Sequence, residues 1–250
     1  MELIVLGCGG TWPAAGGATS GYLLRHDGFN LWLDAGTGTL ARLQEHVKMS
    51  EVGALVITHG HPDHMVDLYP FFYARFYGGQ GPHDLPLYYP HGFFKRIGDL
   101  VGPETTEAMH TAFELHEVTP GDVLDVGPFH ITAYEMAHLG PALGYRIEAN
   151  GAVLAYTGDT GPTPVVDELA KGSDLFIAEA TWQDHQDLLP FHLSARQAGQ
   201  HAASAGAKRL MLTHIWPSLD YEVSRQQAAE EFDGEIIVAE EGMRLDIERS

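Results

Sequence analysis

The chain contains little cysteine, little positive charge and no long hydrophobic run, and each shortage excludes a class of protein. Cys8 is the single cysteine among 250 residues, so neither an intrachain disulfide nor a cysteine-based zinc knuckle can form. The first apolar run, Leu3–Leu6, is too short for a signal peptide. No stretch approaches the roughly 18 apolar residues that a transmembrane helix needs. We therefore expect a cytoplasmic protein without a membrane partner.

Basic residues number 14 against 34 acidic ones, which gives a formal net charge of −20. Such a chain repels a phosphate backbone except where bound metal reverses the local field, so we expect no extended nucleic acid as a partner. Hydrophobic residues make up 44% of the chain, enough to build a full core. Because no linker or low-complexity segment interrupts the pattern, we expect a single domain over residues 1–250.

Four potential metal ligands lie close together in an H-x-H-x-D-H motif: His59, His61, Asp63 and His64. They follow the short apolar run Ala54–Ile57, which predicts a buried strand bounded by glycines. Residues two apart on an extended backbone share a face, so His59 and His61 can point the same way. Asp63 and His64 follow a proline turn and can face a second point. The spacing therefore predicts two neighbouring metal ions.

Three further polar residues follow buried apolar runs in the same way, namely His138, Asp159 and His214. Taken alone, each of these residues would more often be structural than a ligand. Their shared position at the end of a strand makes them candidates. Asp34 and Asp67 are candidates for residues that hydrogen-bond the ligand imidazoles.

The hydrophobic pattern predicts strand runs followed by helices twice along the chain. In the first half we expect strands at 3–6, 22–25, 30–33, 54–57 and 86–89, and helices at 39–47, 67–77 and 93–101. In the second half we expect strands at 123–126, 129–134, 144–147, 153–157, 175–178, 209–213 and 236–239, and helices at 164–170, 194–205 and 222–231. This order predicts an α/β protein in which two sheets pack face to face with helices outside.

The stretch 69–77 is rich in aromatic residues and follows the metal motif closely. Its rings either pack in the core or offer a surface on which a purine stacks, and Arg75 is a candidate phosphate contact. The sequence leaves both interpretations open.

The order H-x-H-x-D-H, His, Asp, His resembles the metallo-β-lactamase fold superfamily over nearly the whole chain. The resemblance implies an αββα four-layer sandwich with two mixed β-sheets flanked by helices, and a two-metal site at one edge. It also implies that His59, His61 and His138 bind the first metal. Asp63, His64 and His214 would bind the second, and Asp159 would bridge the two.

Within that superfamily the chain looks most like the ribonuclease Z-like phosphodiesterases. The residues that carry this resemblance are Gly144–Ile147, Glu179–Thr181 and Phe191–Ala195. In those enzymes an extra histidine acts near the leaving group, and His192 matches it. The long exosite arm by which ribonuclease Z grips tRNA would lie between His138 and Asp159, and here that interval is too short to contain it.

The bacterial cyclic-nucleotide phosphodiesterases of this fold form a compact subgroup without the arm. This chain is similar to them at three further motifs: Ser20–Leu24, Asp63–Leu68 and Thr157–Gly161. The resemblance implies hydrolysis of a small phosphodiester, foremost 3′,5′-cyclic AMP to AMP, by a metal-bridging hydroxide. The alternatives are RNA 3′-processing or cleavage of short RNA, hydrolysis of a lactone or another ester, and metal binding without catalysis.

The expected mechanism assigns two catalytic roles beside the ligands. Asp63 would orient the attacking hydroxide, and His192 would donate a proton to the departing ribose oxygen or hold the phosphate. The expected cofactors are two divalent ions, with zinc as the first choice. His and Asp ligation also suits manganese or iron, which remain alternatives. Relatives of this kind commonly pair, so we expect a homodimer.

Overall fold

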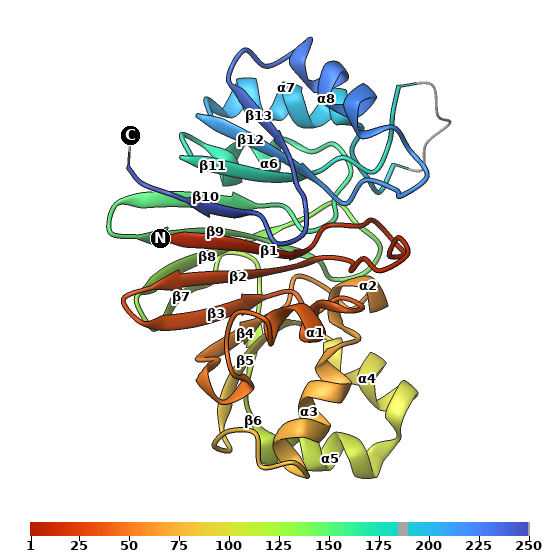
Figure 1. Ribbon diagram of the computed structural model, residues 1–250, viewed down its shortest axis with the longest axis vertical. Coiled ribbons are helices and arrows are strands. Elements are labelled where there is room, and N and C mark those ends of the chain that lie inside the picture. The colour runs from red at the N-terminus through yellow and green to blue at the C-terminus, as the bar shows by residue number, and fades with distance from the viewer. Residues whose placement is uncertain (185–189, 250) are drawn as a thin grey trace.

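Two mixed β-sheets lie against each other at the centre of the computed structural model, and helices cover the outer face of each (Figure 1). The structure describes residues 1–184 and 190–249. Within these residues, no helix combines the length and the apolar character needed to cross a bilayer. The layering is the αββα sandwich expected from the sequence, which is confirmed.

The first sheet contains seven strands in the order β14 (Arg244–Asp246), β1 (Glu2–Gly7), β2 (Gly21–His26), β3 (Phe29–Leu33), β4 (Ala54–Val56), β5 (Leu85–Pro90) and β6 (Phe113–Val118). The strands from β14 to β3 pair antiparallel, and those from β3 to β6 pair parallel. Parallel pairing begins at β3 because longer crossovers start there, with helices on the outer face.

The second sheet repeats this plan in the order β13 (Glu235–Val238), β12 (Arg209–Thr213), β11 (Leu175–Glu179), β10 (Ala152–Tyr156), β9 (Leu143–Ala149), β8 (Phe129–Glu135) and β7 (Val123–Val126). Its hairpins, from β7 to β10, are antiparallel, and β10 to β13 are parallel.

The helices divide between the two outer layers. On the first sheet lie α1 (Thr39–Leu43), the 3₁₀ turn η1 (Met49–Glu51), α2 (Pro62–Met65), α3 (Leu68–Phe76), α4 (Phe93–Val101) and α5 (Pro103–Ala112). On the second lie α6 (Pro164–Ala170), α7 (Ala195–Ala205) and α8 (Tyr221–Ala229). Helix α7 begins with a capping box between Ser194 and Gln197 and ends at Gly206 in the left-handed conformation, as a serine before the helix and a glycine after it predict.

Side-chain alternation along the strands produces three apolar layers. Residues such as Leu31 and Ile147 point between the sheets, whereas Trp32 packs under the helices of the first sheet and Phe176 under those of the second. A period of two sends successive residues to opposite faces, so a sheet buried on both sides needs apolar residues at nearly every position. The central strands show this continuous apolar pattern.

Five elements were not predicted: η1, α2, α5, β6 and β14. The first two are only three and four residues long. Helix α5 reads P-E-T-T-E-A-M-H-T-A and buries only Met109 and Ala112 among its residues. Strand β6 lies at a sheet edge and carries polar residues at its exposed positions, and β14 is three residues long. Such segments carry too weak a hydrophobic period to be recognised from sequence.

Base stacking was one interpretation of the stretch 69–77. In the structure this stretch lies on α3, and its buried rings belong to the core. Phe71 and Phe72 are fully buried under the first sheet. Arg75 is also buried, donates to the carbonyl of Pro82 and lies over the ring of Phe71. Core packing is therefore the correct interpretation for Phe71 and Phe72, and the phosphate contact considered for Arg75 is wrong.

The carboxyl ends of β4, β8, β10 and β12 meet at one edge of the sandwich, on the side where α2 lies in Figure 1. In open α/β sheets, ligand sites form in the crevice outside such ends. The loops that follow these strands in the two sheets therefore come together at this edge.

Candidate metal centre

All seven predicted ligands lie at this edge, in two groups of converging side chains. The first group is His59, His61, His138 and Asp159, and the second is Asp63, His64, Asp159 and His214; within each group the candidate ligand atoms lie within 4.8 Å of one another. His59 follows β4, whereas Asp63 and His64 lie in the first turn of α2, which Pro62 starts. The turn separates the motif into two directions, as the sequence predicted.

In the first group, Nδ1 of His61 lies 3.0 Å from Nε2 of His59 and 3.0 Å from Nε2 of His138. Oδ2 of Asp159 lies 3.6 Å from Nε2 of His59 and 3.8 Å from Nε2 of His138. Ligands of tetrahedral zinc at about 2.0–2.1 Å are roughly 3.3 Å apart, so these four atoms are spaced as a divalent ion requires.

The second group has the same spacing around the other oxygen of Asp159. Oδ1 of Asp159 lies 3.1 Å from Nε2 of His64 and 3.4 Å from Nε2 of His214. Nε2 of His214 lies 3.1 Å from Oδ2 of Asp63. Among the described residues Asp159 alone belongs to both groups, with one oxygen directed at each, which is the geometry of a bridging carboxylate.

Two observations favour cations in this donor set. Nε2 of His64 and Oδ1 of Asp159 are buried and lie 3.1 Å apart without hydrogen-bond geometry between them, which is costly unless another group satisfies both atoms. Burial lowers the pKa of His64, but the carboxylates of Asp159 and Asp34 outweigh it and hold that pKa well above the ordinary value. Carboxylates therefore dominate the electrostatic surroundings of His64 and favour a positive charge there, and His and Asp donors suit divalent transition metals.

Four of the five candidate ligand imidazoles are oriented through their other nitrogen. His64 Nδ1 donates to Oδ2 of Asp34 at 2.8 Å, and His138 Nδ1 donates to the carbonyl of Phe191 at 2.8 Å. His59 Nδ1 faces the hydroxyl of Thr58 at 3.1 Å, and His214 Nδ1 faces that of Thr181 at 2.7 Å. Such contacts fix the ring and the tautomer that a metal ligand needs.

Asp34 is the centre of the network behind the second group. Besides His64, it accepts hydrogen bonds from the amide and hydroxyl of Thr58 and from the hydroxyl of Tyr156, at 2.7, 2.8 and 2.9 Å. The expectation for Asp34 is therefore met by its contact with His64. The expectation for Asp67 is wrong, because its carboxylate accepts from the amide of Leu40 and caps α1 instead.

These two aspartates provide a matched pair of variants. In Asp34→Asn, a single amide oxygen must replace a carboxylate that accepts four hydrogen bonds, so His64 loses its orientation. We expect metal affinity to fall about 10- to 100-fold, measured by competition with a chromogenic chelator. Asp67→Asn should leave the affinity unchanged, and an equal loss in both variants would contradict the role of Asp34.

His192 lies beside the two groups and is held by Glu179. Its Nδ1 lies 3.0 and 3.1 Å from the two carboxylate oxygens of Glu179, which is fully buried at the end of β11. Burial lowers the pKa of His192, but the Glu179 carboxylate outweighs it and raises the pKa to about 9. The Glu179 carboxylate therefore favours the protonated ring, which is the form that a proton donor needs.

The sequence indicated the Glu179–Thr181 motif without giving either residue a role. The structure gives both residues a role. The Thr181 hydroxyl donates to Oε2 of Glu179 at 2.7 Å and faces Nδ1 of His214 at 2.7 Å. Glu179 thus supports a candidate ligand and the candidate donor together. Its position at the end of a buried strand, like that of the ligands, was the available signal.

Several residues with a strained backbone conformation lie at the same edge. Thr11, Asp34 and His214 have φ angles of 62°, 56° and 56°, a region that residues other than glycine rarely adopt. Gly158, at φ 57°, precedes Asp159, and a Cβ there would lie 2.9 Å from that of Thr58. Strained residues of this kind cluster at functional sites, where the surroundings hold them.

A pocket of about 400 Å³ opens onto the two groups. It is lined by Thr11, His61, Pro62, Asp63, His138, Leu139, Asp159, Phe191 and His192. Its volume lies in the range of small-molecule sites, with polar groups converging on a partly apolar wall.

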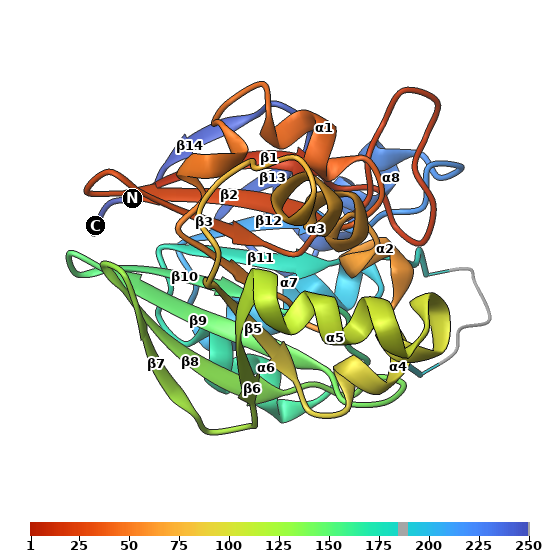
Figure 2. The same cartoon turned by 90° about the horizontal axis from the view of Figure 1, so that it is seen from below.

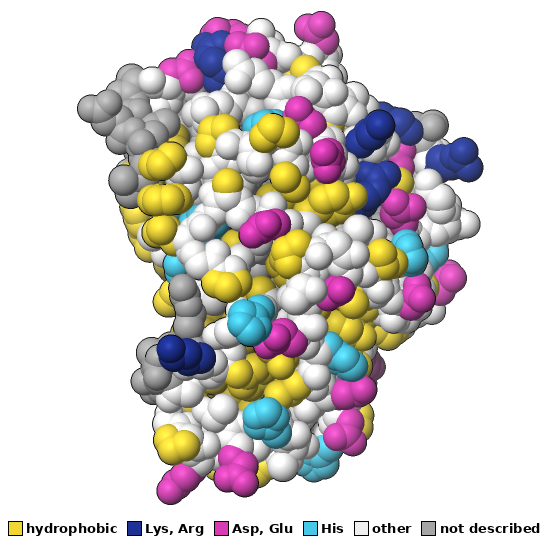
Figure 3. Space-filling view, turned by 180° about the vertical axis from the view of Figure 1, so that it is seen from behind, with side chains coloured by type: hydrophobic (Ala, Val, Ile, Leu, Met, Phe, Trp, Pro, Cys, Tyr) yellow, Lys and Arg dark blue, Asp and Glu magenta, His cyan; other side chains and the backbone are white. Residues whose placement is uncertain are grey.

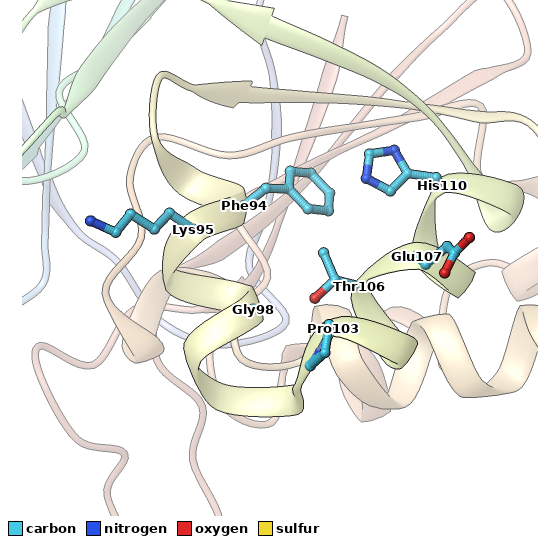
Figure 4. Close-up of a pocket in the computed structure, with 7 residues that line it drawn as sticks. All are labelled: Phe94, Lys95, Gly98, Pro103, Thr106, Glu107 and His110. Atoms are coloured by element: carbon cyan, nitrogen blue, oxygen red, sulfur yellow. The ribbon is translucent and has the colours of Figure 1, made fainter.

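A second hollow, of about 450 Å³, lies between α4 and α5, where Phe94 and His110 face each other with ring centroids 5.5 Å apart (Figure 4). Lys95 and Glu107 lie at its margin and point away from each other. Among residues 1–184 and 190–249, none of the converging groups of potential metal ligands lies there. The pocket at the strand ends is therefore the candidate site for chemistry.

Comparison with known proteins agrees with this architecture. Residues 30–215 match the family described as the β-lactamase superfamily domain. The chain is 32% identical to the Bacillus subtilis protein named "Probable metallo-hydrolase YhfI", over 97% of this chain and 98% of that protein. The crystal structure of YhfI superposes with a TM-score of 0.89, covering 98% of both chains at 29% identity.

Two further relatives are named for their activities. The chain is 27% identical to the ribonuclease Z of Methanopyrus kandleri, over 99% of each. A diphosphatase from the PhnP family shares the fold, with a TM-score of 0.76 at 21% identity over 99% of this chain and 98% of that one. The interval between His138 and Asp159 holds only β9, β10 and their turns, so the chain has the compact form. The chain belongs to the β-lactamase superfamily and is a metal-dependent hydrolase with ribonuclease Z-like relatives.

Proposed function

We propose that this metallo-hydrolase cleaves a small phosphodiester, foremost a 3′,5′-cyclic nucleotide, with cyclic AMP converted to 5′-AMP. The observation that carries the proposal is the joint placement of three features around one pocket. Two ligand groups share Asp159, and a histidine whose protonated form Glu179 favours lies beside them. Phosphodiester hydrolysis needs an activated water, charge neutralisation at phosphorus and a proton for the leaving alkoxide.

The proposed ligands are the seven residues of the two groups, and the ions are two divalent metals, with zinc the first choice. When bound, such a pair lowers the pKa of a shared water and neutralises charge on the phosphoryl oxygens. The chain's own residues do the rest. Asp63, whose Oδ2 also accepts from the amide of Thr11 at 3.1 Å, orients the attacking water and accepts its proton.

His192 completes the reaction. Because Nδ1 faces Glu179, Nε2 is the atom left to serve the substrate. The water oxygen forms a bond to phosphorus, the bond from phosphorus to O3′ breaks, and Nε2–H gives its proton to O3′. The product keeps its phosphate on O5′.

The second candidate is cleavage of RNA, favoured by the ribonuclease Z relative. Two observations favour the small substrate over it. On the face seen in Figure 3, Lys and Arg side chains stand in small separate groups among acidic ones and form no continuous basic track. The net charge of −20 opposes an extended polyanion. The cytoplasmic location and the homodimer stay predictions.

A substrate panel tests the proposal. The metal-loaded protein is assayed with 3′,5′-cyclic AMP, a short RNA with a 3′ extension, a lactone and an aryl ester. We expect the cyclic nucleotide to be turned over with the highest kcat/KM and to yield 5′-AMP. Turnover of RNA alone would favour the second candidate, and turnover of the lactone or ester alone would overturn phosphodiester hydrolysis.

A further inference from the structure

An exposed tryptophan stands at the rim of the candidate site without a role in the chemistry described above. Trp12 lies in the loop between β1 and β2, drawn in red beside α2 in Figures 1 and 2. Its side chain is 40% exposed. Exposing a large aromatic ring to water is unfavourable, so such a ring in a fixed place beside a pocket points to a ligand.

The loop that carries Trp12 is anchored on the catalytic side. The amide of the preceding residue, Thr11, donates to Oδ2 of Asp63 at 3.1 Å, and its hydroxyl accepts from Nε1 of Trp216 at 3.1 Å. Thr11 also lines the pocket. The position of Trp12 is thereby tied to a proposed metal ligand.

The other end of the loop is anchored as well. Oε1 of Glu241 accepts from the amide of Ala18 at 2.6 Å, and Arg42 bonds both Oε2 of Glu241 and the carbonyl of Gly16, at 3.0 and 2.7 Å. With both ends fixed, the tip holds Trp12 in place before a ligand arrives, which reduces the entropy lost on binding.

Aromatic rings connect Trp12 to the proposed proton donor. The ring of Trp12 lies 5.1 Å from that of Trp216, Trp216 lies 4.5 Å from Trp182, and Trp182 lies 5.7 Å from His192. These centroid distances fall in the range of favourable aromatic pairs. The four rings form a continuous chain of aromatic contacts from His192 to Trp12.

A second apolar side chain faces the site from the loop after β8. Leu139 lines the pocket, is 50% exposed and directly follows His138. The site therefore has a charged floor of ligand groups and an apolar rim, which suits a substrate with a phosphate at one end and a planar apolar group at the other.

We propose that Trp12 is a specificity-determining residue that stacks on the base of a nucleotide substrate. The inference rests on the proposed function, which places the phosphate at the ligand groups. It adds the residue that recognises the planar heterocycle of such a phosphodiester. Stacking on an aromatic side chain is possible for every base, so Trp12 selects for the presence of a base more than for its identity.

The test compares two cyclic phosphates on the metal-loaded full chain: 3′,5′-cyclic AMP and the same ribose cyclic phosphate without a base. For Trp12→Ala we expect KM for cyclic AMP to rise about 5- to 150-fold, with kcat within about twofold, because the lost stacking affects binding. The base-free substrate should show no change. Trp12→Phe should keep most of the affinity, and Tyr77→Ala, which removes a 74% exposed ring at the end of α3, should behave as wild type.

A binding measurement separates this inference from the proposed function. Binding of 5′-AMP to the metal-loaded wild type and to metal-loaded Trp12→Ala is measured by isothermal titration calorimetry, whose signal does not depend on the tryptophan that is removed. If neither cyclic phosphate is hydrolysed but 5′-AMP binds more weakly to the variant, the cyclic phosphodiesterase proposal fails and the role of Trp12 stands. If the variant affects both substrates equally, or 5′-AMP binds equally to both proteins or to neither, the role of Trp12 is overturned.

Discussion

Replacing Asp159 by asparagine should reduce the metal content from the proposed two ions per chain to one at most and lower turnover by at least about 10³-fold. The reason is that its two oxygens serve different groups: Oδ2 faces His59 and His138, and Oδ1 faces His64 and His214. A neutral amide removes the shared negative charge and offers one oxygen in place of two. Metal per chain is measured by inductively coupled plasma mass spectrometry, and turnover with a diester.

Asp167→Asn is the control for this substitution. Asp167 lies on α6 and accepts hydrogen bonds from His201 and Ser204, away from both groups. It should keep two metals and full turnover. Retention of two ions and normal turnover by Asp159→Asn would show that Asp159 is not a bridge.

The second large effect is expected at His192. In His192→Ala, kcat for cyclic AMP should fall about 10²- to 10⁴-fold, because the ribose oxygen must leave without a proton donor. With bis(p-nitrophenyl) phosphate the loss should be much smaller, since p-nitrophenolate leaves without protonation. Metal content should be unchanged. Loss of one metal ion in this variant would make His192 a ligand, and equal losses on both substrates would contradict the donor role.

The pH profile gives an independent test of His192. The donor is active only when protonated, so kcat for cyclic AMP falls as pH rises through the pKa of His192. Burial lowers this pKa and Glu179 raises it, with a net result of about 9. In Glu179→Gln the raising charge is lost, so the alkaline limb should move to lower pH. Bound cations lower both midpoints by repulsion, and the informative quantity is the difference between the two proteins.

The sequence predicted the layers of the fold because the central strands are buried on both faces. Runs such as Ala54–Ile57 and Leu175–Ala178 have no polar position, and each is followed by a residue that the site uses. Segments at the periphery were missed for the opposite reason. Seven of the 16 residues in 103–118 are exposed and only four are buried, so neither the helix nor the edge strand carries a clear period.

Within the site, four candidate ligands could be predicted because the local spacing of the H-x-H-x-D-H motif identifies them, and His138, Asp159 and His214 could be assigned through their order and the family resemblance. Their partners could not, because these contacts join distant parts of the chain. Asp34 and Asp67 both look suitable in the sequence, and only the fold shows that Asp34 reaches His64 while Asp67 caps a helix. Trp12 meets Trp216 across more than 200 residues of sequence, which no local pattern indicates.

The most direct test of the account is a metal titration of the metal-free protein, with zinc content and cyclic AMP turnover measured at each step. Two ligand groups that share one carboxylate predict that activity appears only as the second equivalent binds, and that the product is 5′-AMP. Full activity at one equivalent would contradict the two-metal mechanism. Two bound equivalents without any diester hydrolysis would leave the fold and the metal site but overturn the phosphodiesterase.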